Sequence, residues 1–128
     1  MCDRVGIQNL FFGGNTSTAF TPQMFEYGNE IKQPVPLGES PSSFQARLVN
    51  VGPDFKALLQ YVLPENDFYI RGGDCNGIFN KTAAESLLPN AATIESYGHT
   101  NTGHAFPLHK NATAGYEVTF DLLKRNGL

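Results

Sequence analysis

Apolar residues follow their most regular pattern in the second half of the chain. Residues 57–63 form an apolar run that is interrupted only by Gln60 and closed by Pro64. A short run of this kind, with β-branched and aromatic members, is typical of a buried parallel strand. Residues 81–88 predict a two-turn helix that ends before the next proline, and residues 91–98 alternate enough between apolar and polar to predict a second strand.

The last stretch, residues 111–126, has apolar positions at helical spacing. They include one i, i+4 row, formed by Ala114, Val118 and Leu122. Gly127 then occupies the usual position of a helix C-cap, and the glycine-rich stretch at 71–80 predicts a loop. The resulting order of strand, loop, helix, strand, loop and helix predicts an α/β fold with a small parallel sheet and flanking helices.

The first half of the chain is less regular. Residues 4–13 predict a short helix that a glycine pair stops. Thr21 followed by Pro22 predicts the N-cap and first residue of a second helix, which we expect to be one short turn ended by Gly28. Residues 32–43 contain three prolines and predict an extended connector.

Length and composition fit a globular chain of 128 residues, 41% hydrophobic and 16% charged. We expect two parts: a cap-like helical segment with its connector over residues 1–56, and an α/β unit over residues 57–128. The net charge of -3 gives no electrostatic reason to expect nucleic acid as a partner. No apolar stretch of the sequence approaches the roughly 18 residues of a membrane span, and neither a cofactor nor a metal ion is expected.

Cysteines, sequons and the N-terminus bear on the compartment. Cys2 and Cys75 match neither a metal-binding pattern nor a disulfide framework. They predict two free or buried thiols, and a disulfide, including one with a partner chain, is the alternative. The N-terminus lacks the basic region, apolar core and cleavage site of a signal peptide, which favours an intracellular protein or a true N-terminus further upstream. Three sequons, beginning at Asn15, Asn80 and Asn111, hint at a secretory ancestry.

Candidate catalytic groups follow the two predicted strands. Glu65 and Asp67 come after the first strand, and His99 and His104 come after the second. Because the carboxyl ends of parallel strands meet at one edge of a sheet, we expect these groups to lie close together. An acid followed by a histidine is the chain order of α/β-hydrolases, in which the acid orients the histidine that serves as general base. Gly103, beside His104, allows a close approach of the backbone.

Four short motifs stand in order over residues 58–128. They are Glu65-Asn66-Asp67, Gly72-Gly73-Asp74-Cys75, Thr102-Gly103-His104 and Leu108-His109-Lys110-Asn111-Ala112. This set resembles the C-terminal region of fungal proteins of the α/β-hydrolase superfamily, and the first half is more loosely similar to their cap. The resemblance implies a partial α/β-hydrolase fold that contains the last strands, with Asp67 as the acid and His104 as the base of a catalytic triad.

The nucleophile of a serine hydrolase is missing from the sequence. The family's elbow, Gly-x-Ser-x-Gly, occurs nowhere in the 128 residues, and the serine-containing stretches at 13–20 and 38–44 have a different pattern. By the resemblance, the elbow and the first strands would precede residue 1. We therefore expect the C-terminal portion of a larger hydrolase, or a shortened descendant of one.

Other interpretations of these residues stay open. His99 is a second candidate base, and Asp74 is a rival acid whose glycine-rich surroundings favour a turn-forming role instead. Cys75 is a weak candidate for a substitute nucleophile. The five-residue spacing of His99, His104 and His109 does not place three imidazoles on one face of a helix, which disfavours a metal site.

Two functions from different classes follow. The first is a protein of ester or acyl hydrolase ancestry, whose partner is an apolar acyl or ester compound or the missing N-terminal half. The second is a non-catalytic remnant or binding protein that retains an apolar pocket or pairs with a partner chain. We also expect the isolated chain to be marginally stable, oligomeric or aggregation-prone, because so small a parallel sheet leaves unpaired edges.

Overall fold

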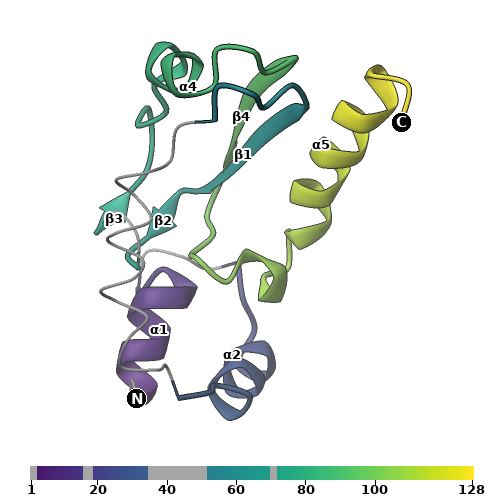
Figure 1. Cartoon of the computed structure of the whole chain (residues 1–128). Helices are drawn as coiled ribbons and strands as arrows, with labels where there is room; N and C mark the ends of the chain where they lie inside the picture. Colours follow the sequence, from purple (N-terminus) through teal and green to yellow (C-terminus); the bar gives the residue numbers. More distant parts are fainter. Residues whose placement is uncertain (1–2, 16–18, 35–51, 70–71) are drawn as a thin grey trace.

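The two predicted strands lie side by side at the centre of the molecule (Figure 1). The structure, a computed structural model, describes residues 3–15, 19–34, 52–69 and 72–128. The elements in chain order are α1 (Arg4–Phe12), α2 (Pro22–Glu30), β1 (Leu58–Pro64), β2 (Asn66–Asp67), β3 (Gly73–Asp74), α4 (Lys81–Leu87), β4 (Thr93–His99), the 3-10 helix η1 (Phe106–Leu108) and α5 (Ala112–Arg125).

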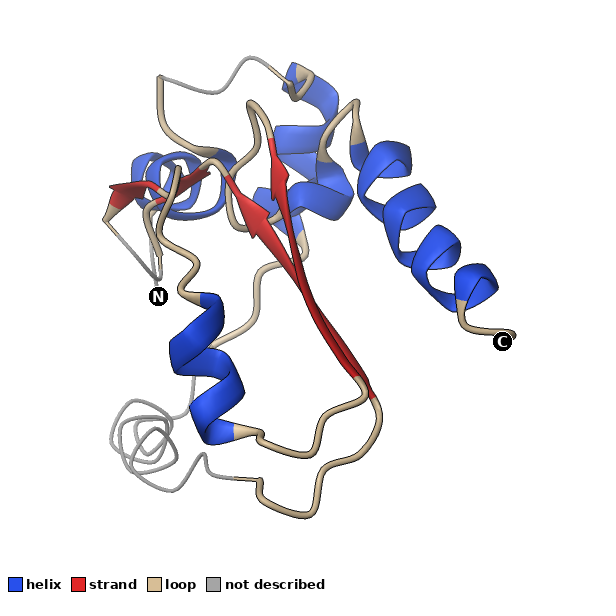
Figure 2. Ribbon diagram, turned by 90° about the horizontal axis from the view of Figure 1, so that it is seen from above, coloured by secondary structure: helices blue, strands red, loops and turns tan. Residues whose placement is uncertain are grey.

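Strands β1 and β4 run parallel, in a register that extends from Leu58 opposite Thr93 to Pro64 opposite His99. Helices α4 and α5 lie on opposite sides of this pair (Figure 2), and both contact β4. The small parallel sheet and its flanking helices confirm the predicted α/β class. Both strands, the helix at 81–88 and the helix at 111–126 are present where the sequence predicts them.

Strand β1 is less buried than its apolar sequence predicts. Pro64 is buried, but the other residues of the strand are intermediate or exposed, and Tyr61 is 36% exposed. Within the described residues β1 pairs with β4 alone, so no strand covers its other edge. The prediction of a buried strand is therefore wrong for this arrangement, since a parallel strand is buried only where neighbours cover both faces and both edges.

The glycine-rich stretch at 71–80 contains a short strand, contrary to the prediction of a loop. Strand β3 pairs antiparallel with β2, so that Asn66 lies opposite Asp74 and Asp67 lies opposite Gly73. Gly73 has a φ of 130°, a backbone conformation that favours glycine. This short ladder fixes the backbone of Asp67 directly after β1.

Helix α1 confirms its prediction at both ends. The Asp3 carboxylate caps the helix by accepting a 2.7 Å hydrogen bond from the Gly6 amide. At the other end, Gly13 adopts the left-handed conformation, with a φ of 77°. Arg4 in the first turn forms an ion pair with Glu26 of α2, and its guanidinium lies 4.7 Å from the centroid of the Phe25 ring.

Helix α2 begins as predicted but is longer than predicted. The Thr21 hydroxyl caps its start, whereas Gly28 does not end it and the helix continues to Glu30. A Cβ atom on Gly28 would lie 2.9 Å from Phe12 and 3.1 Å from Leu108, so this glycine permits α2 to pack closely on α1 and η1. From residue 35 onward, the connector predicted for residues 32–43 lies outside the described residues.

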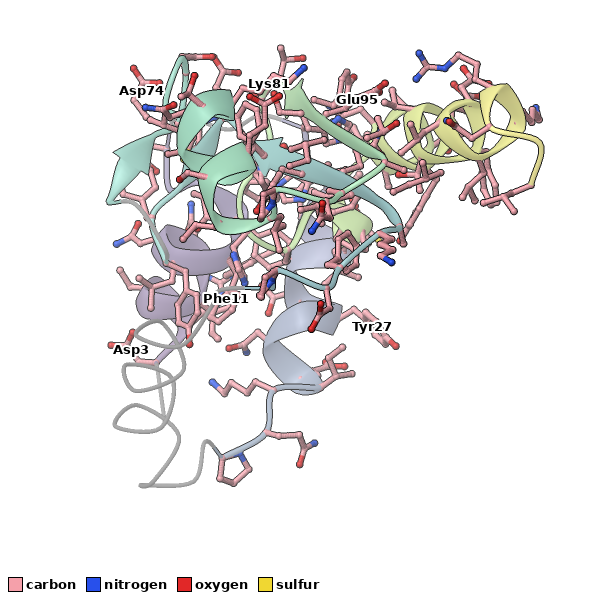
Figure 3. All side chains as sticks on the ribbon, turned by 45° about the horizontal axis from the view of Figure 1, so that its top comes forward. Asp3, Phe11, Tyr27, Asp74, Lys81 and Glu95 are labelled. Atoms are coloured by element: carbon pink, nitrogen blue, oxygen red, sulfur yellow. The ribbon has the colours of Figure 1, made fainter. Side chains whose placement is uncertain are left out.

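A hydrophobic cluster among the described residues joins the helical pair to the chain that follows β4. Its buried members Ile7, Phe12 and Phe25 are packed by three partly buried residues: Phe11, Phe20 and Leu108. The rings of Phe12 and Phe25 meet edge to face with centroids 5.3 Å apart. On the other side of α2, Tyr27 points away from the molecule and is 51% exposed (Figure 3).

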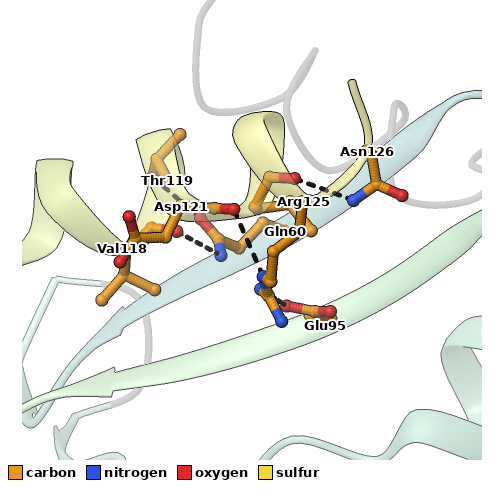
Figure 4. A network of polar contacts seen from close by, with 8 residues as sticks. Gln60, Glu95, Val118, Thr119, Asp121, Arg125 and Asn126 are labelled. Atoms are coloured by element: carbon orange, nitrogen blue, oxygen red, sulfur yellow. Dashed lines mark hydrogen bonds and ion pairs between the residues drawn. The ribbon is translucent and has the colours of Figure 1, made fainter. Parts of the chain in front are cut away.

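Helix α5 is attached to the sheet by polar contacts (Figure 4). The Thr119 hydroxyl donates a 2.8 Å hydrogen bond to the Gln60 side chain of β1. Near the end of α5, the Arg125 guanidinium donates to the Glu95 carboxylate of β4 at 3.0 Å. Both contacts involve exposed or half-buried groups and are each worth little. Helix α5 also buries apolar surface, since Leu122 is 3% exposed.

Candidate acid–histidine site

Asp67 and His104 form a hydrogen bond across the ends of the parallel strands. The distance from His104 Nδ1 to Asp67 Oδ2 is 2.9 Å. Asp67 lies in β2, directly after β1, and His104 lies five residues beyond the end of β4. The topology therefore brings together the acid and the histidine that the sequence singles out, at the edge where the sequence places them.

Backbone hydrogen bonds continue past the strands and tie the two loops together. The Glu65 amide donates to the His99 carbonyl at 3.0 Å, and the Asn66 amide donates to the Thr102 carbonyl at 2.8 Å. Thr102 is fully buried, and its hydroxyl donates to the His99 carbonyl at 2.7 Å. Asp67 and His104 are thus held by a nearly continuous ladder rather than by free loops.

Gly103 packs against the end of α1. A Cβ atom at this position would lie 2.4 Å from the Gly13 amide nitrogen and 2.6 Å from the Phe11 carbonyl oxygen. The same Phe11 carbonyl accepts a 2.8 Å hydrogen bond from the Ala105 amide. The close approach expected of Gly103 is confirmed, and its partner is the N-terminal helix, which thereby sets the position of the His104 loop.

Two aromatic rings frame His104. Its ring centroid lies 5.6 Å from that of Phe11, edge to face, and 4.8 Å from that of Tyr69, while Phe11 and Tyr69 stack on each other at 5.2 Å. The Asp67 side chain is 8% exposed and the His104 side chain 35% exposed. The acid is therefore shielded from water, whereas the imidazole keeps one side open.

The hydrogen bond indicates the tautomer of His104. An ionised carboxylate only accepts hydrogen bonds, so Nδ1 carries the proton that it donates to Asp67. The other ring nitrogen, Nε2, then holds a lone pair, and no described residue forms a hydrogen bond with it. A neutral imidazole in this state can accept a proton at Nε2, which is the chemical requirement for a general base.

An apolar cavity of about 350 Å³ lies beside the aromatic frame. Phe11 and Tyr69 contribute to its wall together with Ala105, the residue after His104. The remaining lining is Ile7, Phe12, Gly28, Ile31, Lys32, Gln33 and Leu108. Its size falls at the lower end of the range for small-molecule pockets, and apolar side chains form most of it.

The competing carboxylates have structural roles. Asp74 is exposed, and its side chain accepts a 2.9 Å hydrogen bond from the Asn76 amide. This is the turn-forming role considered for it from the sequence. The Glu65 carboxylate accepts hydrogen bonds from the Asn101 amide and the Asn76 side chain, and so it bridges the two loops.

The other two histidines are buried. His99 is the last residue of β4 and is 1% exposed, and neither of its ring nitrogens has a hydrogen-bond partner among the described residues. Burial lowers the pKa of His99, and the nearby Asn111 backbone partly opposes this. His109, 4% exposed, hydrogen-bonds the backbone near His104 instead of facing the site. Only His104 combines a carboxylate partner with access to solvent.

Among the described residues, no nucleophile is placed at the site. The His104 ring makes no hydrogen bond to a serine or cysteine side chain in the part of the chain that the structure describes. Cys75 is buried, and its thiol points to the Gly73 carbonyl at 3.4 Å; Cys2 lies outside the described residues. The described residues also contain no group of three His, Cys, Asp or Glu side chains that could hold a metal ion.

The sequence does not point to several residues that build this site. Phe11 and Tyr69 come from segments that are not motifs, and only their shared contact with His104 reveals them. Thr102 and His109 belong to the motifs, but their spacing alone does not show what they contact. The sequence signal that could have led to Thr102 and His109 is their place in the Thr-Gly-His and Leu-His motifs.

Comparison of the chain with protein-family models, with curated proteins and with solved structures gives no match. Over the described residues, no helix is both long and apolar enough to cross a membrane.

Proposed function

We propose that this chain carries the acid and the histidine of a Ser-His-Asp hydrolase of the α/β-hydrolase superfamily. The observation that supports this most strongly is the 2.9 Å hydrogen bond from His104 Nδ1 to Asp67 Oδ2 at the carboxyl ends of parallel strands. That edge is where ligands bind in open α/β sheets. The acid is buried and the imidazole is half-exposed, as a triad requires of the acid that orients the histidine and of the histidine that reaches the nucleophile.

In this proposal each residue has one chemical task. Asp67 holds His104 in the tautomer with the proton on Nδ1 and stabilises the imidazolium that forms during reaction. His104 Nε2 takes the proton of a serine hydroxyl and later gives it to the leaving group. The serine and the oxyanion hole would come from polypeptide outside these 128 residues, such as the N-terminal half of a larger hydrolase or a partner chain.

The cavity beside Phe11 and Tyr69 supports an apolar acyl or ester compound as the substrate. Its lining is mostly aliphatic and aromatic, so transfer of an acyl chain from water into it is favourable by about 25 cal/mol per Å² of apolar surface. Ala105 lines the cavity and directly follows His104 in the chain, which would place a bound acyl group near the base.

A second candidate is a binding protein without turnover. The observation that favours it is the combination of a formed apolar cavity with no serine or cysteine bonded to His104 among the described residues. In that case the cavity would still bind apolar acyl compounds, and Asp67 and His104 would serve only to hold the two loops together.

The hydrolase proposal is tested by joining the chain to a polypeptide that carries a Gly-x-Ser-x-Gly elbow, encoded upstream or separately. Labelling of the serine by a fluorophosphonate and turnover of a nitrophenyl ester are then measured. We expect His104→Ala and Asp67→Asn to lower turnover by about 10⁴-fold. Asp74→Asn is the matched control and is expected to retain activity, because among the described residues the exposed Asp74 side chain bonds only to the Asn76 amide of the following turn. Turnover that survives His104→Ala would contradict the proposal.

The binding candidate is tested on the chain alone. Titration with a medium-chain acyl ester, followed by NMR, is expected to shift the resonances of Phe11 and Tyr69 if the cavity is the binding site. Phe11→Ala is expected to weaken binding, whereas Phe120→Ala, which changes a 58% exposed ring on α5, is the control and is expected to have no effect. Equal effects of the two variants would argue against the cavity as a site.

A further inference from the structure

We propose that His109 is a positioning residue that clamps the backbone on both sides of His104. His109 follows His104 by five residues and lies just after η1. It does not touch Asp67 or the cavity. Its importance for catalysis rests on the function proposed above, but the clamp itself is a structural claim that can be tested without any activity.

The two ring nitrogens of His109 bond to the two residues that flank His104. Nδ1 lies 3.0 Å from the Ala105 carbonyl oxygen, and Nε2 accepts a 3.2 Å hydrogen bond from the Gly103 amide. A carbonyl oxygen cannot donate, so Nδ1 must carry the proton, and Nε2 is then free to accept. Only one tautomer, in the neutral state, satisfies both bonds at once.

The His109 ring is packed between two phenylalanine rings. It stacks on Phe12 with an interplanar angle of 25° and a centroid distance of 5.4 Å, and Phe20 meets it edge to face at 6.0 Å. The residue is only 4% exposed. Both phenylalanines belong to the hydrophobic cluster that joins the helical pair, so the clamp is anchored in that cluster.

Burial disfavours the charged imidazole and lowers the pKa of His109, with backbone hydrogen bonds partly opposing the change. Around the ring, Phe12 and Phe20 present no charge. Among the described residues, the titratable group that acts on it is His99 at the end of β4, which lowers the pKa of His109 further. The adjacent Lys110 is exposed. Protonation of His109 would set an N–H at Nε2 against the N–H of Gly103, and the clamp would open on that side.

The clamp helps to fix the position of the His104 backbone. Gly103 is wedged against α1, and Ala105 is bonded to Phe11, so His109 adds a third tie to a segment of three residues. A catalytic side chain has to be held within about 0.5 Å of its productive position by surrounding groups. His109 supplies that support through the main chain, without contacting the reacting atoms.

The test measures hydrogen exchange of the Gly103 amide and the visibility of the His104 Nδ1–H resonance. In His109→Phe, which keeps the ring stacking, we expect Gly103 exchange to accelerate by about tenfold and the Nδ1–H signal to broaden. In His109→Gln, an amide oxygen can again accept from Gly103, and protection is expected to return. The Asn66 amide, which bonds to Thr102, is the internal reference and is expected to stay protected in both.

His99→Phe is the matched control, since it removes an equally buried imidazole that has no hydrogen bond among the described residues. It is expected to leave both signals unchanged. Unchanged signals in His109→Phe, or the same loss in His99→Phe, would overturn the clamp. If His109→Phe does not fold, hydrogen exchange of the parent chain is measured as the pH is lowered. The Gly103 amide is then expected to lose its protection from exchange before the Asn66 amide does. Simultaneous loss of protection at both amides would overturn the clamp. None of these results depends on ester hydrolysis, so failure of the proposed function would leave the clamp standing.

Discussion

Gly103 and Gly13 lie in direct backbone contact, although 90 residues separate them in the sequence. A Cβ atom on Gly103 would be only 2.4 Å from the Gly13 amide nitrogen, closer than real side chains come to backbone. This contact seats the loop that carries His104 on the end of α1. The first helix is thus part of the candidate site and not merely a neighbouring element.

Gly103→Ala is expected to destabilise the fold by about 1–3 kcal/mol, because neither backbone segment can move aside without breaking the Ala105–Phe11 hydrogen bond. Gly98→Ala is the control, since a Cβ at Gly98 meets no atom within 4 Å, and it is expected to change stability by less than about 0.5 kcal/mol. Urea unfolding of the two variants measures the difference. Equal unfolding free energies of the two variants would contradict a close backbone contact at Gly103.

Acid is expected to destabilise the protein below about pH 6.5. Burial lowers the pKa values of both His99 and His109 from the ordinary 6.5. Between 6.5 and the lowered values, the unfolded chain binds more protons than the folded chain, so stability falls as the pH falls and is level above this window. Thermal melts from pH 8 to pH 5 measure the effect.

The matched variants for this pH dependence are His99→Phe and His109→Phe, combined in one chain. The double variant is expected to lose most of the decline between pH 6.5 and pH 5, whereas the single variant His104→Ala, which removes a half-exposed histidine, is expected to keep it. Stability that rises on acidification in this range would contradict the assignment of both rings as buried and neutral.

The isolated chain is expected to show no ester hydrolysis above the level of a His104→Ala control. An acid–histidine pair without a nucleophile can at most activate water as a general base, an effect worth about 10²–10⁴-fold. Assays with short- and medium-chain nitrophenyl esters provide the measurement. Turnover of order 1 s⁻¹ that disappears in Asp67→Ala would mean that a nucleophile is present in the chain after all.

The purified chain is also expected to be marginally stable, oligomeric or aggregation-prone. Strand β1 has one paired neighbour among the described residues, and Tyr116 and Phe120 on α5 are 47% and 58% exposed. Unpaired strand edges and exposed aromatic rings favour association. Light scattering and thermal unfolding test this, and a clean monomer with a cooperative transition at about 45–65 °C would count against it.

The sequence predicts the site more closely than it predicts the packing around it. Asp67 and His104 could be found because each follows a strand, and parallel strands deliver their carboxyl ends to one edge. Gly103 could be found because a glycine beside the histidine allows the backbone to approach closely. These inferences depend on local order along the chain and on one topological rule.

The sequence could not predict contacts between residues that lie far apart in the chain. Gly28 looks like a helix end, yet it lies within α2. A glycine stands at this position because Phe12 and Leu108 occupy the space that a side chain would need. The burial expected for β1 failed for a related reason, since burial depends on which other segments cover a strand. His109 looks like one member of a histidine row until its contacts with Gly103 and Ala105 are known.

The central claim is that Asp67 holds His104 with the proton on Nδ1 and leaves Nε2 free to act as a base. A two-bond ¹⁵N–¹H correlation spectrum of the histidine rings tests it directly, because it distinguishes the two neutral tautomers at neutral pH. We predict the Nδ1–H form for His104, retained in Asp74→Asn and lost in Asp67→Asn. An Nε2–H tautomer in the unaltered chain, or a spectrum that does not change in Asp67→Asn, would contradict the claim.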